Sequence, residues 1–303
     1  MGNVILLLFC LAAGMGLRAL KRVPENAHQA MNAFVINISL PALALLEIPS
    51  IDLSDRLFVP ISMPWLMFAV VAPSMWLACT ISGLSRNTTG ALILTAGLAN
   101  TSFMGVPMIE AFYGQSYMAI GLLIDQLGTY LVLSTLGLAI ACYCSRGTAS
   151  IGEIVGRIAI FPPLLALLLA VALAAMRIEY PPMIDSLLQR LASTLAPLAL
   201  VSVGLQLRLG ALSGKLSELG LGLGVKLVAA PLVLALLYLW LVGTSGDLAR
   251  VTLFESAMGP QIGGAIVATQ YGLDPPLVTL MVGIGTLMAF FSLPAWWYLL
   301  QLA

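Results

Sequence analysis

Apolar runs of about 20 residues follow one another from end to end of the 303-residue chain, with only short polar breaks between them. A run of that length crosses about 30 Å of hydrocarbon when it is helical. Only 9% of the residues are charged, whereas soluble domains usually carry about 25%. So few charges cannot cover a surface that faces water, and the Leu- and Ala-rich runs lack the alternation of a membrane β-barrel. The sequence therefore predicts an all-α membrane protein with no segment left for a soluble domain.

The polar interruptions divide the chain into ten predicted transmembrane spans. Basic residues follow the first apolar run instead of preceding it, so an uncleaved first helix is expected rather than a secretory signal. The predicted spans are residues 3–20, 29–48, 58–83, 88–113, 116–144, 151–176, 184–209, 216–243, 248–271 and 275–300.

Basic residues are distributed unequally between the loops. The loops after odd-numbered spans hold eight of them, namely Arg18, Lys21, Arg22, Arg86, Arg146, Arg157, Arg208 and Lys215. The loops after even-numbered spans hold four, namely Arg56, Arg177, Arg190 and Arg250. The positive-inside rule therefore predicts a multi-pass protein of the cell (inner) membrane with both termini outside the cytoplasm.

The two halves of the chain resemble one another. The basic segment at residues 144–157 separates five spans in residues 1–145 from five in residues 146–303, and because five is odd, similar halves must have inverted orientations. Spans four and nine both close with a Tyr-Gly pair, and aligning these pairs places Gly105-Val106-Pro107 level with Gly263-Gly264. Gly and Pro interruptions at corresponding mid-membrane positions are typical of the binding site of a secondary transporter.

Six segments along nearly the whole chain resemble the auxin efflux carrier family, which includes plant auxin exporters and bacterial carriers of small organic acids. They are NAFVINISLPALAL in span two, NTSFMGVPMIEAFYG in span four, LLIDQLG in span five, LAPLALVSVGLQL in span seven, VKLVAAPL in span eight and ESAMGPQIGGAIVATQYGLD in span nine.

This resemblance to a bacterial-type carrier implies ten transmembrane helices in two inverted five-helix repeats, with helices four and nine broken and crossing at the membrane centre. Helices 1, 2, 6 and 7 would form a scaffold that also dimerises. Helices 3–5 and 8–10 would form a transport domain that moves by elevator-like or rocking alternating access. The fold is similar to that of bile-acid sodium symporters and sodium/proton antiporters, so the coupling ion stays open between Na⁺ and H⁺.

The two broken helices define the predicted substrate site. Their second halves begin near residues 106–108 and 263–265, and the positive ends of these half-helices suit a carboxylate. The alternative for Asn100 is that it satisfies backbone groups freed by the break. The predicted substrate-binding residues are Asn100, Thr101, Ser102, Gly105, Val106, Pro107, Pro260, Gln261, Gly263 and Gly264.

Ionisable residues inside the spans are the candidates for ion coupling. A charge near the bilayer centre costs roughly 3 kcal/mol on insertion scales, so such residues are usually paired or functional. Asp125 and Lys226 are predicted to form an ion pair that switches during the cycle, and a permanent salt bridge is the alternative. Glu255 and Ser256 complete the predicted ion-coupling set. Glu110, near the outer end of span four, is expected to snorkel toward water.

Two coupling ions are compatible with these residues. A sodium ion would take oxygen ligands from Glu255, Asn100 and Ser102, whereas a proton would be carried by Asp125 or Glu255.

The predicted function is therefore secondary active transport of a small organic anion, without a resident cofactor. The sequence contains no Walker-type loop and no HExxH or GxSxG motif, which argues against direct ATP drive and against an enzyme. The alternatives are a sodium symporter for a bulkier amphipathic acid and a membrane sensor that does not transport. The expected partners are the organic anion, the lipid bilayer and a second copy of the chain, and no nucleic acid is expected.

Overall fold

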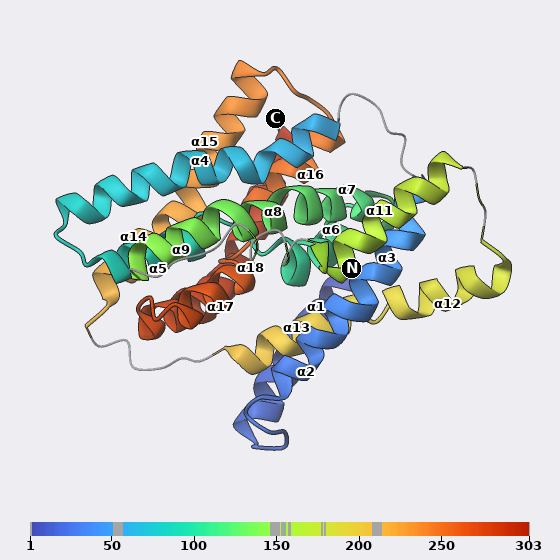
Figure 1. Ribbon diagram of the computed structural model, residues 1–303, viewed down its shortest axis with the longest axis horizontal. Helices are drawn as coiled ribbons and strands as arrows, with labels where there is room; N and C mark the ends of the chain where they lie inside the picture. The colour runs from blue at the N-terminus through green and yellow to red at the C-terminus, as the bar shows by residue number, and fades with distance from the viewer. Residues whose placement is uncertain are drawn as a thin grey trace. The chain divides into compact units, whose positions relative to one another are not determined.

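The computed structural model describes residues 2–50, 57–145, 159–176, 180–207 and 214–302, together with residues 152, 156 and 178. Within these residues every regular element is an α-, π- or 3-10 helix (Figure 1). The β-type pairing among them is a single isolated bridge between Ala99 and Pro260. The predicted all-α class is confirmed.

Six of the described helices are long and apolar enough to cross a membrane. Two further apolar helices are shorter, and the segments predicted as spans four and nine are each interrupted. The chain is therefore a multi-span helical protein, whereas the count of ten spans and their inverted repeat stay predictions. The six helices are Ala27–Glu47, Phe58–Ile81, Gln115–Ser145, Pro182–Gln206, Leu216–Leu241 and Pro275–Leu302.

The predicted orientation depends partly on residues that the structure does not describe. Arg56, Arg146, Arg157, Arg177 and Arg208 lie outside the described residues. Residue 146, where the second predicted half begins, also lies outside them. The placement of both termini and the division into two halves therefore stay predictions.

The chain forms two compact units, each of which is described by itself. The first unit contains residues 1–56, 102–122 and 157–207, and the second contains residues 57–101, 123–156 and 208–303. The chain changes unit inside predicted span four, between Thr101 and Ser102. The predicted scaffold and transport domain stay predictions.

The first unit contains a close helix pair, α1 (Gly2–Ala19) and α13 (Leu195–Gln206), which lie side by side in Figure 1. Gly14 and Gly204 lie where these two helices are closest. A Cβ atom on either glycine would overlap backbone atoms of the other helix. Small residues permit this close approach between membrane helices.

Polar contacts at α13 also connect helices of the first unit. Arg18 Nη1 donates a hydrogen bond to Leu205 O at 2.8 Å, which places a cation at the negative C-terminal end of α13. Ser202 Oγ donates to Asn32 Oδ1 of α2. The other helical segments of this unit are α2 (Ala27–Phe34), η1 (Val35–Ser39), α3 (Leu40–Glu47), η2 (Ile48–Ser50), α6 (Val106–Phe112), η5 (Gln115–Tyr117), α11 (Pro162–Ala175) and α12 (Pro182–Ala192). Two segments, η4 (Thr101–Gly105) and α7 (Met118–Leu123), each have one end residue in the second unit.

The second unit contains π-helical segments inside two of its long helices. Residues 115–145 include η6 (Ile124–Thr129) and η7 (Leu133–Gly137), and residues 216–241 include η8 (Val225–Ala229) and η9 (Leu236–Leu241). Such segments are frequent at functional sites, and Asp125 lies in η6 while Lys226 lies in η8. The other helices are α4 (Phe58–Ile81), α5 (Arg86–Ala96), α8 (Tyr130–Val132), α9 (Leu138–Ser145), α14 (Leu216–Gly224), α15 (Ala230–Ala235), α16 (Asp247–Ser256), α17 (Ile262–Gln270) and α18 (Pro275–Leu302).

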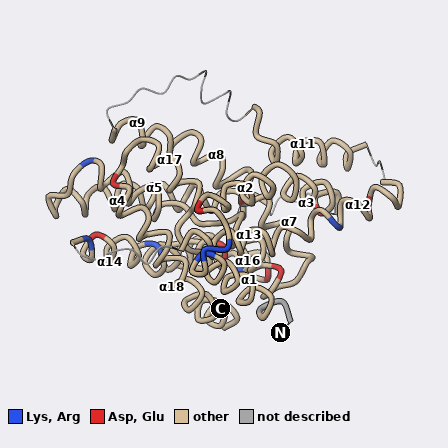
Figure 2. Tube along the Cα trace, turned by 90° about the horizontal axis from the view of Figure 1, so that it is seen from below, with Lys and Arg blue, Asp and Glu red and all other residues tan. Residues whose placement is uncertain are grey.

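Charged residues are sparse along the described chain (Figure 2). Most of them are exposed or half-buried, as expected for side chains that lie at helix ends. The buried ones within the described residues are Glu47, Asp125, Lys226 and Glu255, of which the last three belong to the second unit.

Candidate functional site

The first predicted interruption separates α5 from α6. Helix α5 ends at Ala96, residues 97–100 are not helical, and the chain continues through the π-helical segment η4 into α6. Pro107 lies in the first turn of α6 but follows η4 without a gap, so its missing N–H group removes a hydrogen bond from a continuous helical segment. The break therefore lies at residues 97–100, before the Gly105-Val106-Pro107 segment at which the Gly and Pro pattern predicted it, and Thr101 and Ser102 lie after the break instead of before it.

The second predicted interruption separates α16 from α17. Helix α16 ends at Ser256, α17 begins at Ile262, and Pro260 lies between them. Gln261 caps α17, because its Oε1 accepts a hydrogen bond from Gly264 N at 2.9 Å. Gln261 thus stabilises the second half of the broken helix, while its predicted contact with substrate stays a prediction.

The non-helical residues of the two interruptions meet within the second unit. Asn100 N donates to Gly259 O at 3.0 Å, and Ala99 and Pro260 form the antiparallel bridge. Backbone groups that the breaks remove from helical pairing are therefore partly satisfied by each other, as apolar surroundings require.

Close packing requires a glycine at the start of α17. A Cβ atom on Gly264 would overlap the backbone carbonyl of Leu94 in α5, whereas a Cβ on Gly263 would meet a methyl group of Leu133 at 3.0 Å. Backbone cannot move away as a flexible side chain can. The structure thus gives Gly264 a packing role, and its predicted substrate contact stays a prediction.

The predicted substrate-binding residues belong to both compact units. Those in the second unit are Asn100, Thr101, Pro260, Gln261, Gly263 and Gly264. Those in the first unit are Ser102, Gly105, Val106 and Pro107.

Asp125 is held by two short hydrogen bonds. Its side chain is 3% exposed and accepts from Thr101 Oγ1 at 2.5 Å and from Gln126 Nε2 at 2.6 Å. Bonds to an ionised carboxylate are stronger than those between neutral groups, so both donors favour the charged form. Thr101 and Asp125 are therefore brought together, although one was predicted for substrate and the other for the ion.

Lys226 lies in η8, and its side chain reaches the end of α16, the first half of the other broken helix. The residue is 0% exposed, and its Nζ donates to Ser256 O at 2.9 Å. Ser256 is the last residue of α16, where free carbonyl groups carry partial negative charge. The position predicted to attract a cation is thus occupied by an ammonium group of the protein. The predicted pairing of Lys226 with Asp125 stays a prediction.

Glu255 is buried in the same region. It is 0% exposed, and neither of its carboxylate oxygens has a hydrogen-bond partner among the described residues. Its charge interacts with those of Asp125 and Lys226. These three side chains, Asp125, Lys226 and Glu255, are called the buried charge cluster below.

Three buried polar residues were missed by the sequence interpretation. Gln126 Oε1, Thr129 Oγ1 and Thr286 Oγ1 each have no hydrogen-bond partner among the described residues. Gln126 and Thr129 lie in η6 beside Asp125, and Thr286 lies in α18. Amide and hydroxyl groups within apolar spans were a signal that could have identified them.

The predicted sodium site stays a prediction, because Glu255 is its only carboxylate. Across the described residues, no group of three or more His, Cys, Asp or Glu side chains is arranged to hold a metal ion. Of the predicted set, Glu255 and Asn100 belong to the second unit and Ser102 belongs to the first.

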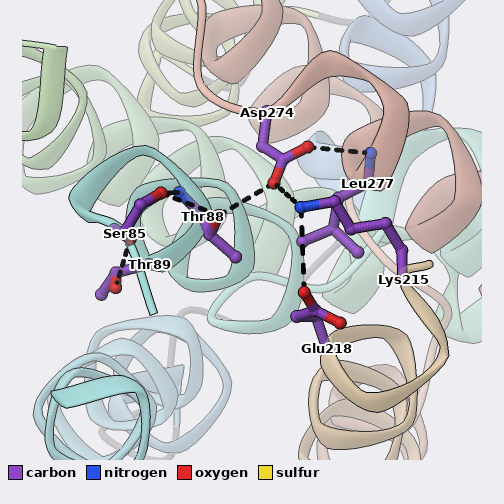
Figure 3. A network of polar contacts seen from close by, with 7 residues as sticks. All are labelled: Ser85, Thr88, Thr89, Lys215, Glu218, Asp274 and Leu277. Atoms are coloured by element: carbon purple, nitrogen blue, oxygen red, sulfur yellow. Dashed lines mark hydrogen bonds and ion pairs between the residues drawn. The ribbon is translucent and has the colours of Figure 1, made fainter. Parts of the chain in front are cut away.

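A second group of charged residues connects the ends of three helices in the second unit (Figure 3). Asp274 Oδ2 accepts from Lys215 Nζ at 2.8 Å and from Thr88 Oγ1 at 2.9 Å. Lys215 Nζ also lies 3.8 Å from Glu218 Oε1. Lys215, Asp274 and Thr88 lie at the starts of α14, α18 and α5. Together with Glu218 they are called the helix-end cluster below.

The helix-end cluster shifts the pKa values of its charged members. The hydrogen bond to Asp274 raises the pKa of Lys215. Burial by itself would raise the pKa of Asp274, but hydrogen bonds from Lys215 and Thr88 outweigh it and hold that pKa below its usual range. Both shifts favour the charged forms, so the pair is stable over the physiological pH range.

Comparison with known proteins points to transport. The sequence model of a family described as membrane transport protein matches residues 1–297. An uncharacterised transporter of Methanothermobacter thermautotrophicus is 27% identical over 297 residues, which cover 97% of this chain and 96% of the relative. An uncharacterised transporter of Methanocaldococcus jannaschii is 26% identical over 314 residues, which cover 99% of each chain.

Proposed function

Because the chain belongs to the membrane transport protein family, the family of auxin efflux carriers that the sequence resembles, we propose that it is a secondary active transporter of a small organic anion. The proposed cargo is a carboxylate, and the proposed driving force is a gradient of protons or sodium ions. Transport proceeds by alternating access in the cell membrane, from a homodimer whose scaffold is formed by helices 1, 2, 6 and 7.

The buried charge cluster is the observation that carries this proposal. Asp125 and Glu255 supply two carboxylates, whereas Lys226 supplies one ammonium group. If all three are charged, one negative charge remains uncompensated inside an apolar protein, and such a charge is costly. One monovalent cation restores neutrality. Glu255 is its proposed acceptor, because both of its oxygens lack hydrogen-bond partners among the described residues.

The contact between the two interruptions supports an anionic cargo. Helix α17 begins inside the second unit, at buried residues beside Pro260 and Asn100. The N–H groups in the first turn of a helix have no partners within that helix, so they attract anions. A carboxylate bound there would lie near the peptide groups that join the two interruptions.

Coupling would follow from the different charges of the two sites. A cation that neutralises Glu255 removes the excess negative charge, which otherwise repels a carboxylate near the break. The cation and the anion therefore favour one another's binding, and such coupling between two ligands is reciprocal.

Uptake into proteoliposomes tests this function. Labelled short-chain mono- and dicarboxylates are offered under an imposed pH gradient, an imposed sodium gradient, or neither. The wild-type protein is expected to accumulate at least one acid under one of the gradients. Glu255→Gln is expected to abolish the gradient dependence, and Asn100→Ala is expected to weaken uptake of the acid.

Glu218→Gln is the matched control, because it changes the same residue type in the helix-end cluster. Its accumulation should equal that of the wild type. Gradient-driven accumulation that survives Glu255→Gln would contradict the coupling role of Glu255. Saturable binding of an acid without flux under any gradient would favour a sensor over a transporter.

A further inference from the structure

Two tryptophans of the second unit donate hydrogen bonds to backbone carbonyl groups inside the π-helical segments of the buried charge cluster. Trp296 Nε1 of α18 donates to Leu227 O in η8 at 2.9 Å. Trp65 Nε1 of α4 donates to Leu127 O in η6 at 3.1 Å. Each of these carbonyl groups lies one or two residues after a buried charge, so both indoles hold the backbone beside the cluster.

The carbonyl group of Leu227 needs a donor from outside its own helix. In α-helical pairing it would accept from the N–H group of residue 231, four residues further on, but Pro231 has no N–H group. A carbonyl without a donor is costly in apolar surroundings. Trp296 therefore supplies the hydrogen bond that Pro231 cannot make.

Close packing brings Trp65 to η6. A Cβ atom on Gly128 of η6 would lie 2.5 Å from Cγ of Pro64, the residue before Trp65 in α4. Helix α4 therefore approaches the backbone of η6 more closely than a side chain at residue 128 would permit. This approach places the indole within hydrogen-bond distance of Leu127 O.

The two indoles differ from tryptophans that anchor a helix at the membrane surface. An anchoring tryptophan directs its N–H group toward water and headgroups. Trp240 in η9 is 84% exposed, as an anchor would be. Trp65 and Trp296 are half-buried, and their N–H groups are directed at carbonyl groups of neighbouring helices.

The position of the Lys226 ammonium group depends on the backbone that Trp296 holds. Lys226 is 0% exposed, and its Nζ donates to Ser256 O of α16 at 2.9 Å. Leu227 is the next residue, so a tilt of its carbonyl group displaces the backbone of Lys226 and weakens the contact with Ser256. A buried ammonium group that loses its acceptor is costly, so the cluster is sensitive to this tilt.

We propose that Trp296 and Trp65 are positioning residues for ion coupling, which hold Lys226 and Asp125 in place through the carbonyl groups of η8 and η6. They act through these two charged residues. The consequence for coupling rests on the proposed transport function. The positioning itself is measured by stability, so the two can fail separately.

A double-mutant cycle on the unfolding midpoint in detergent tests the positioning without transport. Trp296→Phe keeps an aromatic ring but removes the N–H group, and it is expected to lower the midpoint by a few degrees. In the Lys226→Met/Glu255→Gln background the same change should lower it clearly less, because no ammonium group remains to be held. Equal shifts in both backgrounds would overturn the positioning role.

Pro231→Ala provides a rescue in the same helix. Alanine returns an N–H group at residue 231, which can donate to Leu227 O in place of the indole. Trp296→Phe alone should lower gradient-driven accumulation about fivefold relative to flux without a gradient, as for the loss of one hydrogen bond. Adding Pro231→Ala should restore both the accumulation and the midpoint.

The two kinds of flux separate positioning from a loss of folded protein. A smaller amount of folded protein would lower both fluxes equally, and that result in Trp296→Phe would overturn the role in coupling. A double variant with Pro231→Ala that is no better than Trp296→Phe would overturn the role of the hydrogen bond. Wild-type protein without gradient-driven accumulation would contradict the proposed function, and the stability cycle would still decide the positioning.

Trp240→Phe is the matched control, because it makes the same change at an exposed tryptophan of the same unit. Its midpoint and its uptake should equal those of the wild type. Trp65→Phe should behave like Trp296→Phe, and its shift in midpoint should be smaller in the Asp125→Asn background. An equal shift there would remove Trp65 from the proposal.

Discussion

The helix-end cluster and the buried charge cluster contain the same kinds of side chain in the same compact unit, but their surroundings differ. At the helix ends, Asp274 accepts from Lys215 and Thr88, and Lys215 is about one third exposed. In the buried charge cluster, Lys226 donates to a backbone carbonyl, and Glu255 has no hydrogen-bond partner among the described residues.

This difference indicates which cluster is structural and which is available for function. Each charge of the helix-end cluster has an opposite charge beside it, so the cluster needs no ligand. Both clusters hold two carboxylates and one ammonium, but in the buried charge cluster all three are buried, where desolvation is expensive, and Glu255 has no hydrogen-bond partner among the described residues. Proteins retain such an arrangement at a cost in stability, and strongly perturbed charges concentrate at functional sites.

The largest effect is expected from removing the buried ammonium group. Lys226→Met leaves Asp125 and Glu255 as two buried carboxylates without compensation, so the folded protein should lose about 3–5 kcal/mol of stability. The measurement is the thermal unfolding midpoint in detergent. Glu255→Gln in the Lys226→Met background should restore much of the midpoint, because it removes one of the two charges. A double variant no more stable than the single one would show that Lys226 acts through packing instead.

A smaller change in stability, but a large change in transport, is expected from Asp125→Asn. The amide keeps the shape of the carboxylate and can still accept from Thr101 or Gln126 through one oxygen. Gradient-driven accumulation should fall to the level measured without a gradient, while the unfolding midpoint changes little. Asp274→Asn serves as the matched aspartate control for uptake. Coupled uptake by folded Asp125→Asn would remove Asp125 from the ion-coupling set.

Neutralising Asp274 in the helix-end cluster should lower stability modestly and should leave uptake unchanged. Asp274→Asn weakens the contacts with Lys215 and Thr88, and a partly exposed pair of this kind contributes about 1 kcal/mol or less. The expected result is a small drop in the unfolding midpoint with unchanged uptake. Loss of coupled uptake in this variant would show that the helix-end cluster takes part in the transport cycle.

The pH dependence of stability should separate the wild type from Asp274→Asn at both extremes. Because the pKa of Asp274 is lowered, its contribution is present above its unfolded-state pKa of about 3.9 and is lost as pH falls through the lower folded-state value. Because the pKa of Lys215 is raised, its contribution is present below about 10.4 and is lost as pH rises through the higher folded-state value. The difference in unfolding midpoint between the wild type and Asp274→Asn should thus be constant near neutral pH. It should shrink at low pH and at high pH.

Raising the salt concentration should have the smallest effect on these differences in stability. Raising the ionic strength to about 1 M shortens the screening length to about 3 Å, which weakens exposed pairs far more than buried ones. The difference in midpoint between the wild type and Asp274→Asn should therefore shrink by a few tenths of a kcal/mol. The destabilisation by Lys226→Met should not change with salt. If salt reduced the effects of Asp274→Asn and Lys226→Met on the unfolding midpoint equally, the buried charge cluster would be open to solvent.

Much of the fold and part of the candidate site could be predicted from the sequence. Long apolar runs predict membrane helices, and the helices and the family match agree with that prediction. Gly and Pro residues predicted the two interruptions, since such residues end or distort helices wherever they occur. The partner of Lys226 could not be predicted, because Ser256 contributes a backbone carbonyl, which every residue carries. Gln126, Thr129 and Thr286 are visible in the sequence as polar residues within apolar spans, but only the structure shows that each has a buried oxygen without a hydrogen-bond partner among the described residues.

The amino-acid sequence by itself determined the helical membrane class, the family and the presence of the two helix breaks, because these depend on local composition and on residues adjacent in the chain. The first break lies at residues 97–100, several residues before the predicted Gly105-Val106-Pro107 segment. The tertiary structure alone decided which breaks meet, why Gly264 cannot carry a side chain, and which charges are paired. Those properties depend on distances between residues far apart in the chain: Asn100 meets Gly259, Lys226 meets Ser256, and Lys215 meets Asp274. Since the energy of a charge depends on its neighbours and its burial, only the folded chain distinguishes the two clusters.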